Sequence, residues 1–465
     1  MFVGKEGFAV KLKTILPALL LCFALLLSCG GAAWADPAPF SMTLLIEDRS
    51  VTVQAYQNEF ANALYLSLSD LSAALRGTPA AFRFAYQKTA EDGEFFTVTI
   101  GQDAQVGSNA GKATEMPWVS SLNLFRNRIF VNNLEHRYYT YRAGKDLFMS
   151  LTDVQLMLDL PAELQEGGLR LYPGQHFHPE VPLLDSQGYF DCFNAVLLGD
   201  ADTGEILYAR CDQSPVPIAS ISKLMTYLLL AEAVERGEFS FSDTVVIPAE
   251  AAALSNGADA MVQLKEGGSV PAQELLEAML LASSNESALA LAIHCAGSEA
   301  AFVARMNERA EELGLDSSRF YTPHGLPVYL PQAVSAKVQN RMSAADLFAL
   351  CRTILREHPE ITRITCERYG SMPTLQFVTA NSNAVVFNLA GCNGLKTGST
   401  NKAGSCLAAS LPITVGGETH TAVAIVLGAE TADARNQAVE ILLRYARDWY
   451  GEQGFPQPEV PDGEG

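Results

Sequence analysis

Residues 217–226 read PIASISKLMT, and this stretch places Ser220 three positions before Lys223. Pro217 introduces it and a long helix-forming run follows, so we expect Ser220 to lie at the N-terminus of a helix. Residues three positions apart share a helix face, so the amine of Lys223 would point towards the hydroxyl of Ser220. Taken alone, the pattern is better explained by a capping serine and a solvated lysine, because SxxK is common by chance.

Two more short motifs follow downstream. Residues 283–285 (Ser-Ser-Asn) interrupt two apolar helical stretches, and a polar break of this kind indicates a turn with a capping side chain. Residues 396–398 (Lys-Thr-Gly) combine a cation, a small hydroxyl residue and a glycine. This combination is typical of a strand whose backbone approaches a ligand, or of a surface turn. Each motif is weak on its own.

In the order SxxK, SxN, KTG, the three motifs resemble those of penicillin-binding proteins and class A β-lactamases. The surrounding residues ADTGEILYA, LLASSNESALALA, TPHGL, MSAADL and GLKTGSTNKAG are similar to the low-molecular-mass penicillin-binding proteins, which are serine-type D-alanyl-D-alanine carboxypeptidases. The resemblance covers residues from about 193 to 450. It implies an α+β fold in which residues 182–450 form a β-lactamase/transpeptidase-like domain, with an antiparallel sheet flanked by helices and an all-helical region.

The chemistry of these motifs requires an unusual lysine. A serine hydroxyl is a poor nucleophile at neutral pH and needs a base, yet the three motifs contain no histidine. Lys223 can accept the proton of Ser220 only as a neutral amine, and an exposed lysine is charged. Burial and a second cation both disfavour the charged form. We therefore expect Lys223 to be desolvated and close to Lys396.

The other site residues are assigned through the resemblance. It implies that Ser220, Lys223 and Ser283 are catalytic, with Ser283 relaying protons to the leaving amine. It also implies a set of substrate-binding residues, namely Asn285, Lys396, Thr397, Gly398 and Ser399. In this assignment Asn285 binds the substrate's peptide, Lys396 and Thr397 hold its terminal carboxylate, and the backbone N–H groups of Ser220 and Ser399 form the oxyanion hole. The family pattern implies neither a metal nor a cofactor.

The implied substrate is a peptidoglycan stem peptide ending in D-Ala-D-Ala, and β-lactam antibiotics would act as inhibitors. Alternative functions are a D,D-endopeptidase, a β-lactamase or esterase of the same fold, or a non-catalytic wall-binding protein. A class A β-lactamase needs a glutamate in an ExxLN-type loop for deacylation, and no such motif lies between Asn285 and Lys396. A carboxypeptidase is therefore the favoured interpretation.

The sequence departs from the family pattern at two places. Ser284 occupies the middle of the SxN motif, where glycine is usual, and residues 327–341 form a longer connection between TPHGL and MSAADL. His324, within TPHGL, is expected to be structural.

The N-terminus has the features of an export signal. Lysines precede an apolar run over residues 15–27, and the small-x-small pattern over residues 33–35 predicts cleavage after a signal peptide of residues 1–35. A second interpretation is a lipoprotein box ending at Cys29, which would then be lipidated. Both interpretations place the protein outside the cytoplasm, in the cell wall or at the membrane.

Residues 40–178 are predicted to form a separate, β-rich domain. LYLSLSDLSAAL (residues 64–75) and LFMSLTDVQLML (residues 147–158) match position by position, and each predicts a strand, a capped turn and a short helix. Asp70 and Asp153 would be capping or first-turn residues. The repeat predicts a pseudo-symmetric module of two lobes, and it weakly resembles the small N-terminal domain of copper amine oxidases. We expect it to act as a spacer or to bind the wall or a protein partner.

The net charge bears on which partners the protein can bind, and the cysteine content bears on disulfide bonds. The formal net charge is −20, which disfavours binding to nucleic acid and to anionic lipid surfaces. Seven cysteines follow the signal, none in a CxxC pair; we expect mostly buried free thiols, although Cys392 and Cys406 flank one loop and a bridge between them is open. His176 and His178 are expected to be linker residues, and residues 451–465 a disordered tail.

Overall fold

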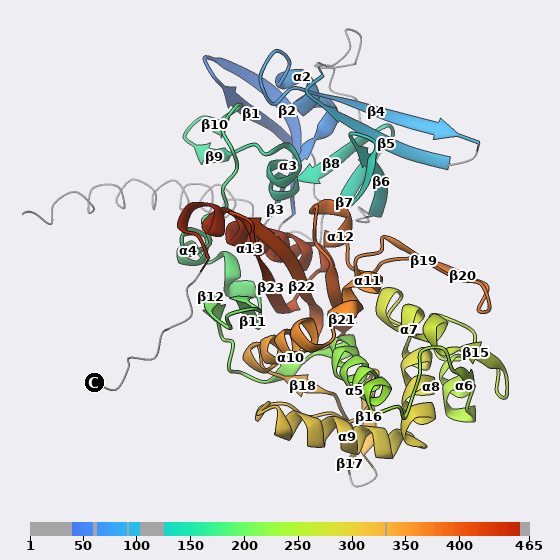
Figure 1. Ribbon diagram of the computed structural model, residues 1–465. Helices are drawn as coiled ribbons and strands as arrows, with labels where there is room; N and C mark the ends of the chain where they lie inside the picture. Colours follow the sequence, from blue (N-terminus) through green and yellow to red (C-terminus); the bar gives the residue numbers. More distant parts are fainter. Residues whose placement is uncertain (1–39, 59–62, 91–92, 103–124, 331–332, 456–465) are drawn as a thin grey trace, which may run out of the picture. The chain divides into compact units, whose positions relative to one another are not determined.

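The computed structural model describes residues 40–58, 63–90, 93–102, 125–330 and 333–455, and the chain divides into two compact units, Met1–Phe177 and His178–Gly465 (Figure 1). The predicted signal peptide and Cys29 lie outside the described residues. Both units contain a sheet and helices, so the α+β class is confirmed. In the part of the chain that is described, no single helix is long and apolar enough to cross a membrane; two consecutive helices reach that length only across an 86° bend.

The N-terminal unit is built on one ten-stranded sheet in the order β4-β5-β6-β7-β8-β3-β2-β1-β10-β9. Its strands are β1 (Phe40–Ile46), β2 (Arg49–Asn58), β3 (Ala63–Ser67), β4 (Phe82–Thr89), β5 (Gly93–Ile100), β6 (Phe125–Val131), β7 (Leu134–Ala143), β8 (Asp146–Ser150), β9 (Ala162–Gln165) and β10 (Gly168–Leu171). Helices α2 (Leu68–Ala74) and α3 (Leu151–Leu158) complete the unit, and their apolar faces are buried in its core.

The sequence repeat corresponds to a structural repeat. β3 leads into α2 and β8 leads into α3, and β3 pairs with β8 antiparallel at the centre of the sheet. Ser67 caps α2 by accepting the N–H of Asp70 at 3.1 Å, and Ser150 caps α3 by accepting the N–H of Asp153 at 3.1 Å. The prediction that Asp70 and Asp153 are first-turn residues is therefore confirmed.

The two copies form one sheet, because each copy supplies a strand that pairs with the other. Each copy has the order β-β-β-α-β-β, and its last strand pairs in parallel with the first strand of the other copy. β5 pairs with β6, and β10 pairs with β1. A tight hairpin cannot join two parallel strands. Each of these two pairs therefore joins strands that are separated by a longer stretch of chain.

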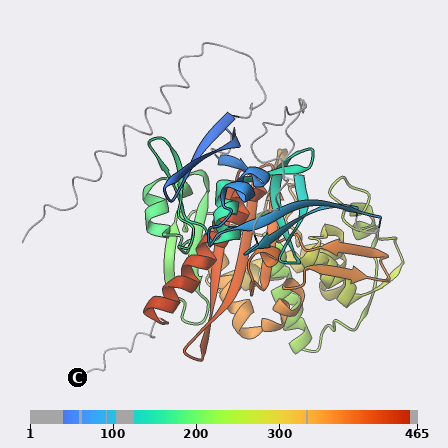
Figure 2. The same ribbon diagram turned by 90° about the horizontal axis from the view of Figure 1, so that it is seen from above.

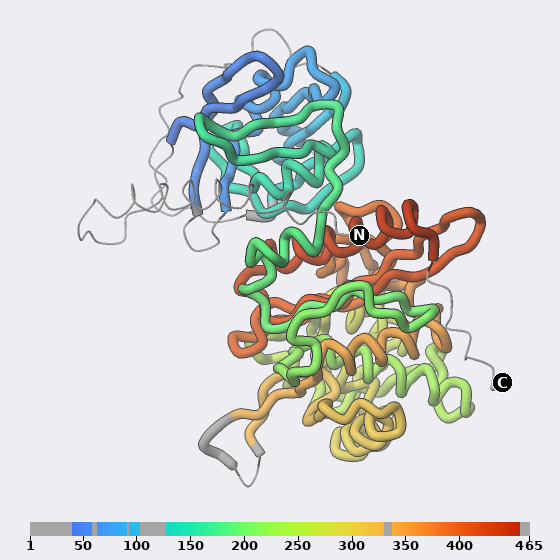
Figure 3. Tube along the Cα trace, turned by 90° about the vertical axis from the view of Figure 1, so that its left-hand side faces the viewer, coloured from blue at the N-terminus to red at the C-terminus, as the bar shows by residue number. Residues whose placement is uncertain are grey.

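The C-terminal unit contains a five-stranded antiparallel sheet in the order β12-β11-β23-β22-β21. Its strands are β11 (Ala195–Asp200), β12 (Ile206–Arg210), β21 (Gly394–Thr400), β22 (Gly404–Val415) and β23 (Glu418–Ala429). β11, from the start of the unit, pairs with β23, from its end, as Figure 3 shows by the green segment beside the orange-red ones. The two ends of this region therefore close one sheet, and the implied antiparallel sheet is present.

Two helices cover opposite faces of this sheet. α13 (Ala432–Gln453) lies along β22 and β23 (Figure 2), and Tyr450 on this helix bonds to Asp200 of β11. A Cβ on the neighbouring Gly199 would instead meet Phe348 of α10 (Ala344–Glu357). Successive residues of a strand point to opposite faces, so α10 lies on the face opposite α13.

The last helix extends into the segment that was predicted as a disordered tail from residue 451. α13 ends at Gln453, where Gly454 has a φ of 76° and terminates it. The side chains of Ala438, Ile441 and Leu442 on this helix are buried, whereas Trp449 is 41% exposed.

The predicted helical region lies between β12 and β21. Besides α10 and the short helices α11 (Thr362–Thr365) and α12 (Val385–Asn388), it includes α5 (Lys223–Glu235), α6 (Ala249–Leu254), α7 (Ala272–Leu281), α8 (Asn285–Ala296) and α9 (Glu299–Glu312). α5 is buried on nearly every side, which explains its continuous apolar sequence. The long connection over residues 327–341 contains the hairpin β16 (Val328–Leu330) and β17 (Ala333–Val338), followed by β18 (Arg341–Met342).

All seven cysteines after the predicted signal are free thiols. Cys392 and Cys406 are buried, but Cys392 Sγ donates to the carbonyl of Gly394 and Cys406 Sγ donates to that of Ala403, so no bridge joins them. The expectation that the thiols are mostly buried is only partly right, because Cys192, Cys211 and Cys366 are exposed.

Candidate active site

Ser220 lies in a 3₁₀ turn, η2 (Ala219–Ser222), directly before α5. The prediction of a helix start is confirmed, with one tighter turn added in front of the helix. Ser222 Oγ closes this turn by donating to the carbonyl of Ala219 at 2.6 Å, and Ala219 has a φ of 48°. A left-handed non-glycine residue is strained, and such residues persist where the surrounding structure holds them, often at functional sites.

Lys223 is the first residue of α5 and is fully buried. Its Nζ lies 2.8 Å from Ser220 Oγ, 2.8 Å from Asn285 Oδ1 and 2.9 Å from the carbonyl oxygen of His324. The last two atoms can only accept hydrogen bonds. A neutral amine has two N–H groups, which these acceptors use, so its lone pair is left facing the hydroxyl of Ser220.

The surroundings favour this neutral amine. Burial lowers the pKa of Lys223 well below its ordinary value, the nearby charge of Lys396 lowers it further, and Glu286 acts in the opposite direction. Both causes that the sequence predicts, desolvation and a second cation, are therefore present. The Lys223 amine thus lies within hydrogen-bond distance of Ser220 Oγ and has a lowered pKa, as a proton acceptor would require.

The SxN motif lies in the turn between α7 and α8. Ser284 is the N-cap of α8: its Oγ accepts the N–H of Ser287 at 3.0 Å and donates to Ser287 Oγ at 2.7 Å. The serine at the usual glycine position is thus a capping residue. Asn285 begins the helix and turns its Oδ1 to Lys223, whereas Ser283 occupies the turn with a φ of 65° and is half-buried.

The KTG motif forms part of β21 and lies directly against the serine turn. A Cβ on Gly398 would come within 2.7 Å of the carbonyl oxygen of Ile218 and 3.0 Å of the backbone nitrogen of Ser220. Only glycine leaves room for this approach. Gly398 therefore brings β21 and the Ser220 turn together, and the next residue, Ser399, is exposed at the end of the strand.

Lys396 and Thr397 provide a cation and a hydroxyl on the same strand. Lys396 is almost fully buried, and burial together with the charge of Arg435 lowers its pKa to about 7. Its Nζ donates to the carbonyl of Thr397 at 2.9 Å, and Thr397 Oγ1 shares a hydrogen bond of 2.7 Å with Ser382 Oγ. Ser382 and Arg435 were not predicted as site residues, because neither belongs to a motif.

The TPHGL segment packs against the serine turn and the start of α5. Besides the contact of the His324 carbonyl with Lys223, Thr226 Oγ1 donates to the carbonyl of Pro323 at 2.6 Å, and Gly325 packs on Ala219. Burial and the charge of Lys223 lower the pKa of His324 to about 3, so its ring is neutral, and its Nδ1 accepts the N–H of Leu326. This arrangement agrees with a structural role for His324.

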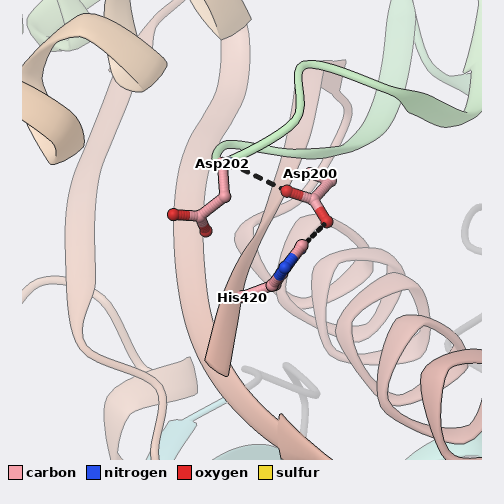
Figure 4. A group of neighbouring side chains, drawn as sticks. All are labelled: Asp200, Asp202 and His420. Atoms are coloured by element: carbon pink, nitrogen blue, oxygen red, sulfur yellow. Dashed lines mark hydrogen bonds and ion pairs between the residues drawn. The ribbon is translucent and has the colours of Figure 1, made fainter. Parts of the chain in front are cut away.

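One other cluster has the composition of a metal site. Asp200, Asp202 and His420 place ligand atoms within 4.8 Å of one another (Figure 4). However, Asp200 already accepts two backbone N–H groups on Oδ1, and on Oδ2 it bonds to His420 Nδ1 at 2.7 Å and to the Tyr450 hydroxyl at 3.0 Å. Asp202 accepts the N–H of Thr421. The cluster thus fits an anchor between β11, β23 and α13 better than a metal site.

The expected linker histidines do not converge on one point. His176 Nδ1 lies 2.5 Å from Asp159 Oδ2, and His178 Nδ1 lies 3.1 Å from Asp448 Oδ2. Each histidine therefore bonds to a different carboxylate.

Comparison with known proteins identifies the family. The model of Peptidase_S11, D-alanyl-D-alanine carboxypeptidase, matches residues 191–431, more than half of the chain. D-alanyl-D-alanine carboxypeptidase DacF of Bacillus subtilis is 32% identical over 55% of this chain and 62% of its own length. DacD of Escherichia coli K12 is 32% identical over 61% of this chain and 67% of its own length.

A solved structure agrees with these sequence matches. That of a peptidoglycan synthesis regulatory factor (PBP3) from Streptococcus pneumoniae is 28% identical, with a TM-score of 0.50, over 56% of this chain and 71% of that one. The family match, residues 191–431, lies within the C-terminal unit, which contains Ser220, Lys223, Asn285 and the KTG strand. The chain belongs to the Peptidase_S11 family of D-alanyl-D-alanine carboxypeptidases.

Proposed function

We propose that this protein is an exported serine carboxypeptidase that removes the terminal D-alanine from peptidoglycan stem peptides. The observation that supports the proposal most directly is the buried Lys223 amine, which lies 2.8 Å from Ser220 Oγ and has a lowered pKa. A nucleophile paired with a base whose neutral form is favoured is what acyl transfer requires.

In the proposed acylation step, Ser220 Oγ attacks the carbonyl carbon of the penultimate D-alanine and gives its proton to Lys223. The oxyanion would be stabilised by the backbone N–H groups of Ser220 and Ser399. The C–N bond then breaks, and the terminal D-alanine leaves with a proton relayed through Ser283. Water, deprotonated by Lys223, hydrolyses the acyl-enzyme and regenerates Ser220.

The substrate's free carboxylate would be recognised at β21. Protonated Lys396 supplies a charge, and Thr397 supplies a hydroxyl on the neighbouring position of the strand. The side-chain amide of Asn285 would bind the substrate's peptide, in addition to its contact with Lys223. A β-lactam would be attacked by Ser220 in the same way and would remain attached, because its leaving group stays tethered to the acyl group.

Two measurements test the proposal together. Incubation with a fluorescent penicillin, followed by mass spectrometry of peptides, should find the label on Ser220, and Ser220→Ala should abolish it. Release of D-alanine from a pentapeptide should depend on the same residue. Cleavage of cross-linked dimers without D-alanine release would favour an endopeptidase, and rapid turnover of benzylpenicillin would favour a β-lactamase. A protein that neither labels nor releases D-alanine would support the wall-binding alternative.

For the N-terminal unit we propose a spacer or binding role towards the cell wall or a protein partner, on the basis of its repeat. A variant that lacks residues 36–178 should still label with penicillin but should associate less with purified walls. Equal wall association of the two proteins would refute a binding role.

Export is proposed from the sequence of residues 1–35. Loss of the first 35 residues from the secreted or wall-bound protein would support signal cleavage, and labelling of Cys29 with lipid would support the alternative.

A further inference from the structure

Glu286 is a fully buried carboxylate at the second position of α8, next to Asn285. Its Oε1 accepts the backbone N–H of Met261 at 2.8 Å and that of Val262. Its Oε2 has no hydrogen-bond partner among the residues that the structure describes. A buried carboxylate oxygen without a partner is costly, so it requires an explanation beyond the folding of one loop.

The loop that Glu286 holds also contacts the site. Within this loop the carbonyl of Asp259 accepts a hydrogen bond from Asn285 Nδ2 at 3.3 Å. That contact orients the amide, because it leaves Oδ1 as the end of the group that faces Lys223 Nζ at 2.8 Å. A chain of contacts thus connects Glu286, the loop over residues 259–262, Asn285 and the base.

We propose that Glu286 is a positioning residue for the reaction. Through Met261 and Val262 it fixes the loop that orients Asn285 towards Lys223, and it adds a buried negative charge to this part of the site. This inference rests on the proposed role of Lys223 as the base and goes beyond the motifs, since Glu286 belongs to none of them.

The carboxylate has a role that an amide could not fill. A glutamine oxygen would accept the same two N–H groups, so the loop alone does not require a charge. The charges that act on Lys223 are those of Lys396 on β21, which lowers its pKa, and Glu286 on α8, which raises it; His324 of the TPHGL segment is neutral. Glu286 is thus the negative charge that opposes Lys396, and it keeps the pKa of Lys223 from falling further.

Two substitutions separate the two parts of this role. Glu286→Gln keeps the reach of the side chain but removes its charge. Glu286→Asp keeps the charge but withdraws the acceptor by one methylene from Met261 and Val262. The matched control is Glu274→Gln in α7, because Glu274 likewise accepts the backbone N–H groups of two loop residues, Thr374 and Leu375, and has no effect on Lys223.

The measurement is the rate of acylation by a fluorescent penicillin as a function of pH, with thermal unfolding of each variant as the control for folding. Removing a negative charge lowers the pKa of a nearby amine, so E286Q should move the acid limb to lower pH by about one unit. E286D should leave that limb in place and lower the plateau rate by about 10²-fold, because the base is misplaced. E274Q should match the wild type in both.

The proposal is overturned if E286Q has the acid limb of the wild type, or if E286D acylates at the wild-type plateau rate. If E286D does not fold, the isosteric E286Q decides alone. Labelling of Ser220 in the wild type reports the proposed function, and only the differences among the variants report the role of Glu286, so the two proposals can fail separately.

Discussion

A Cβ on Gly325 would lie 2.0 Å from the carbonyl oxygen of Ala219, the residue that precedes the serine at the site. Gly325 also has a φ of 89°, a conformation that other residues rarely adopt. The TPHGL segment can therefore pack on the serine turn only with glycine at this position. This contact keeps the carbonyl of the adjacent His324 in reach of Lys223.

We expect Gly325→Ala to abolish acylation by penicillin and to destabilise the protein by more than the ~1–2 kcal/mol of a left-handed alanine. The matched control is Gly237→Ala, because Gly237 has a φ of 70° with no atom within 4 Å of the added Cβ. The free energy of unfolding in urea and the labelling rate check both variants. Equal effects of the two substitutions would show that the close approach to Ala219 is unimportant.

Lys223→Met should remain folded, fail to acylate, and change how stability depends on pH. Between the lowered native pKa of Lys223 and its ordinary value near 10.5, the unfolded chain binds one more proton than the native protein. Wild-type stability should therefore rise with pH in this range, by up to about 1.4 kcal/mol per pH unit for this group. Urea unfolding at several pH values should show a smaller rise for the variant, and parallel curves would mean that Lys223 is charged in the native state.

The specificity constant for a peptide with a free carboxylate should fall as the pH rises above about 7. Lys396 has a pKa of about 7 because of burial and the charge of Arg435, and only its protonated form attracts the carboxylate. Removing a neighbouring cation raises the pKa of a lysine, so Arg435→Gln should move this alkaline limb to higher pH. Profiles of kcat/KM for D-alanine release check both statements, and an unmoved limb in the variant would contradict the assignment to Lys396.

Ser284→Gly, which restores the residue usual in the family, should leave the acylation rate unchanged. Ser284 caps α8 and does not contact Lys223, so the change should cost only a few tenths of a kcal/mol, whereas Ser284→Ala should cost about 1 kcal/mol. Thermal unfolding and penicillin labelling of the two variants test this. A large loss of activity in S284G would show that the cap also positions Asn285.

The contacts predicted most reliably are those between residues that are close together in the sequence. Ser220 and Lys223 meet because residues three positions apart share a helix face, and Ser67 and Ser150 cap their helices through contacts within four residues. The order of the motifs and their resemblance to a known family also predicted which segments gather around Ser220.

Contacts that depend on tertiary structure were not predictable in the same way. The carbonyl of His324 as an acceptor for Lys223, the bond of Ser382 to Thr397 and the burial of Arg435 arise only when distant segments pack together. No spacing in the sequence signals such contacts, because a backbone carbonyl is present at every residue. The open question about Cys392 and Cys406 had the same origin, since proximity in a loop does not determine where two thiols point.

The interleaving of the two repeats in the N-terminal unit constrains how that unit could be divided. Residues 125–171 alone would leave β6, β8 and β10 without their neighbours β5, β3 and β1, so a single copy would expose three unpaired strand edges. Two such fragments could restore these pairings only by pairing with each other. We therefore expect a half-length version of this unit to dimerise, whereas the tandem duplication provides the same strand pairs within one polypeptide.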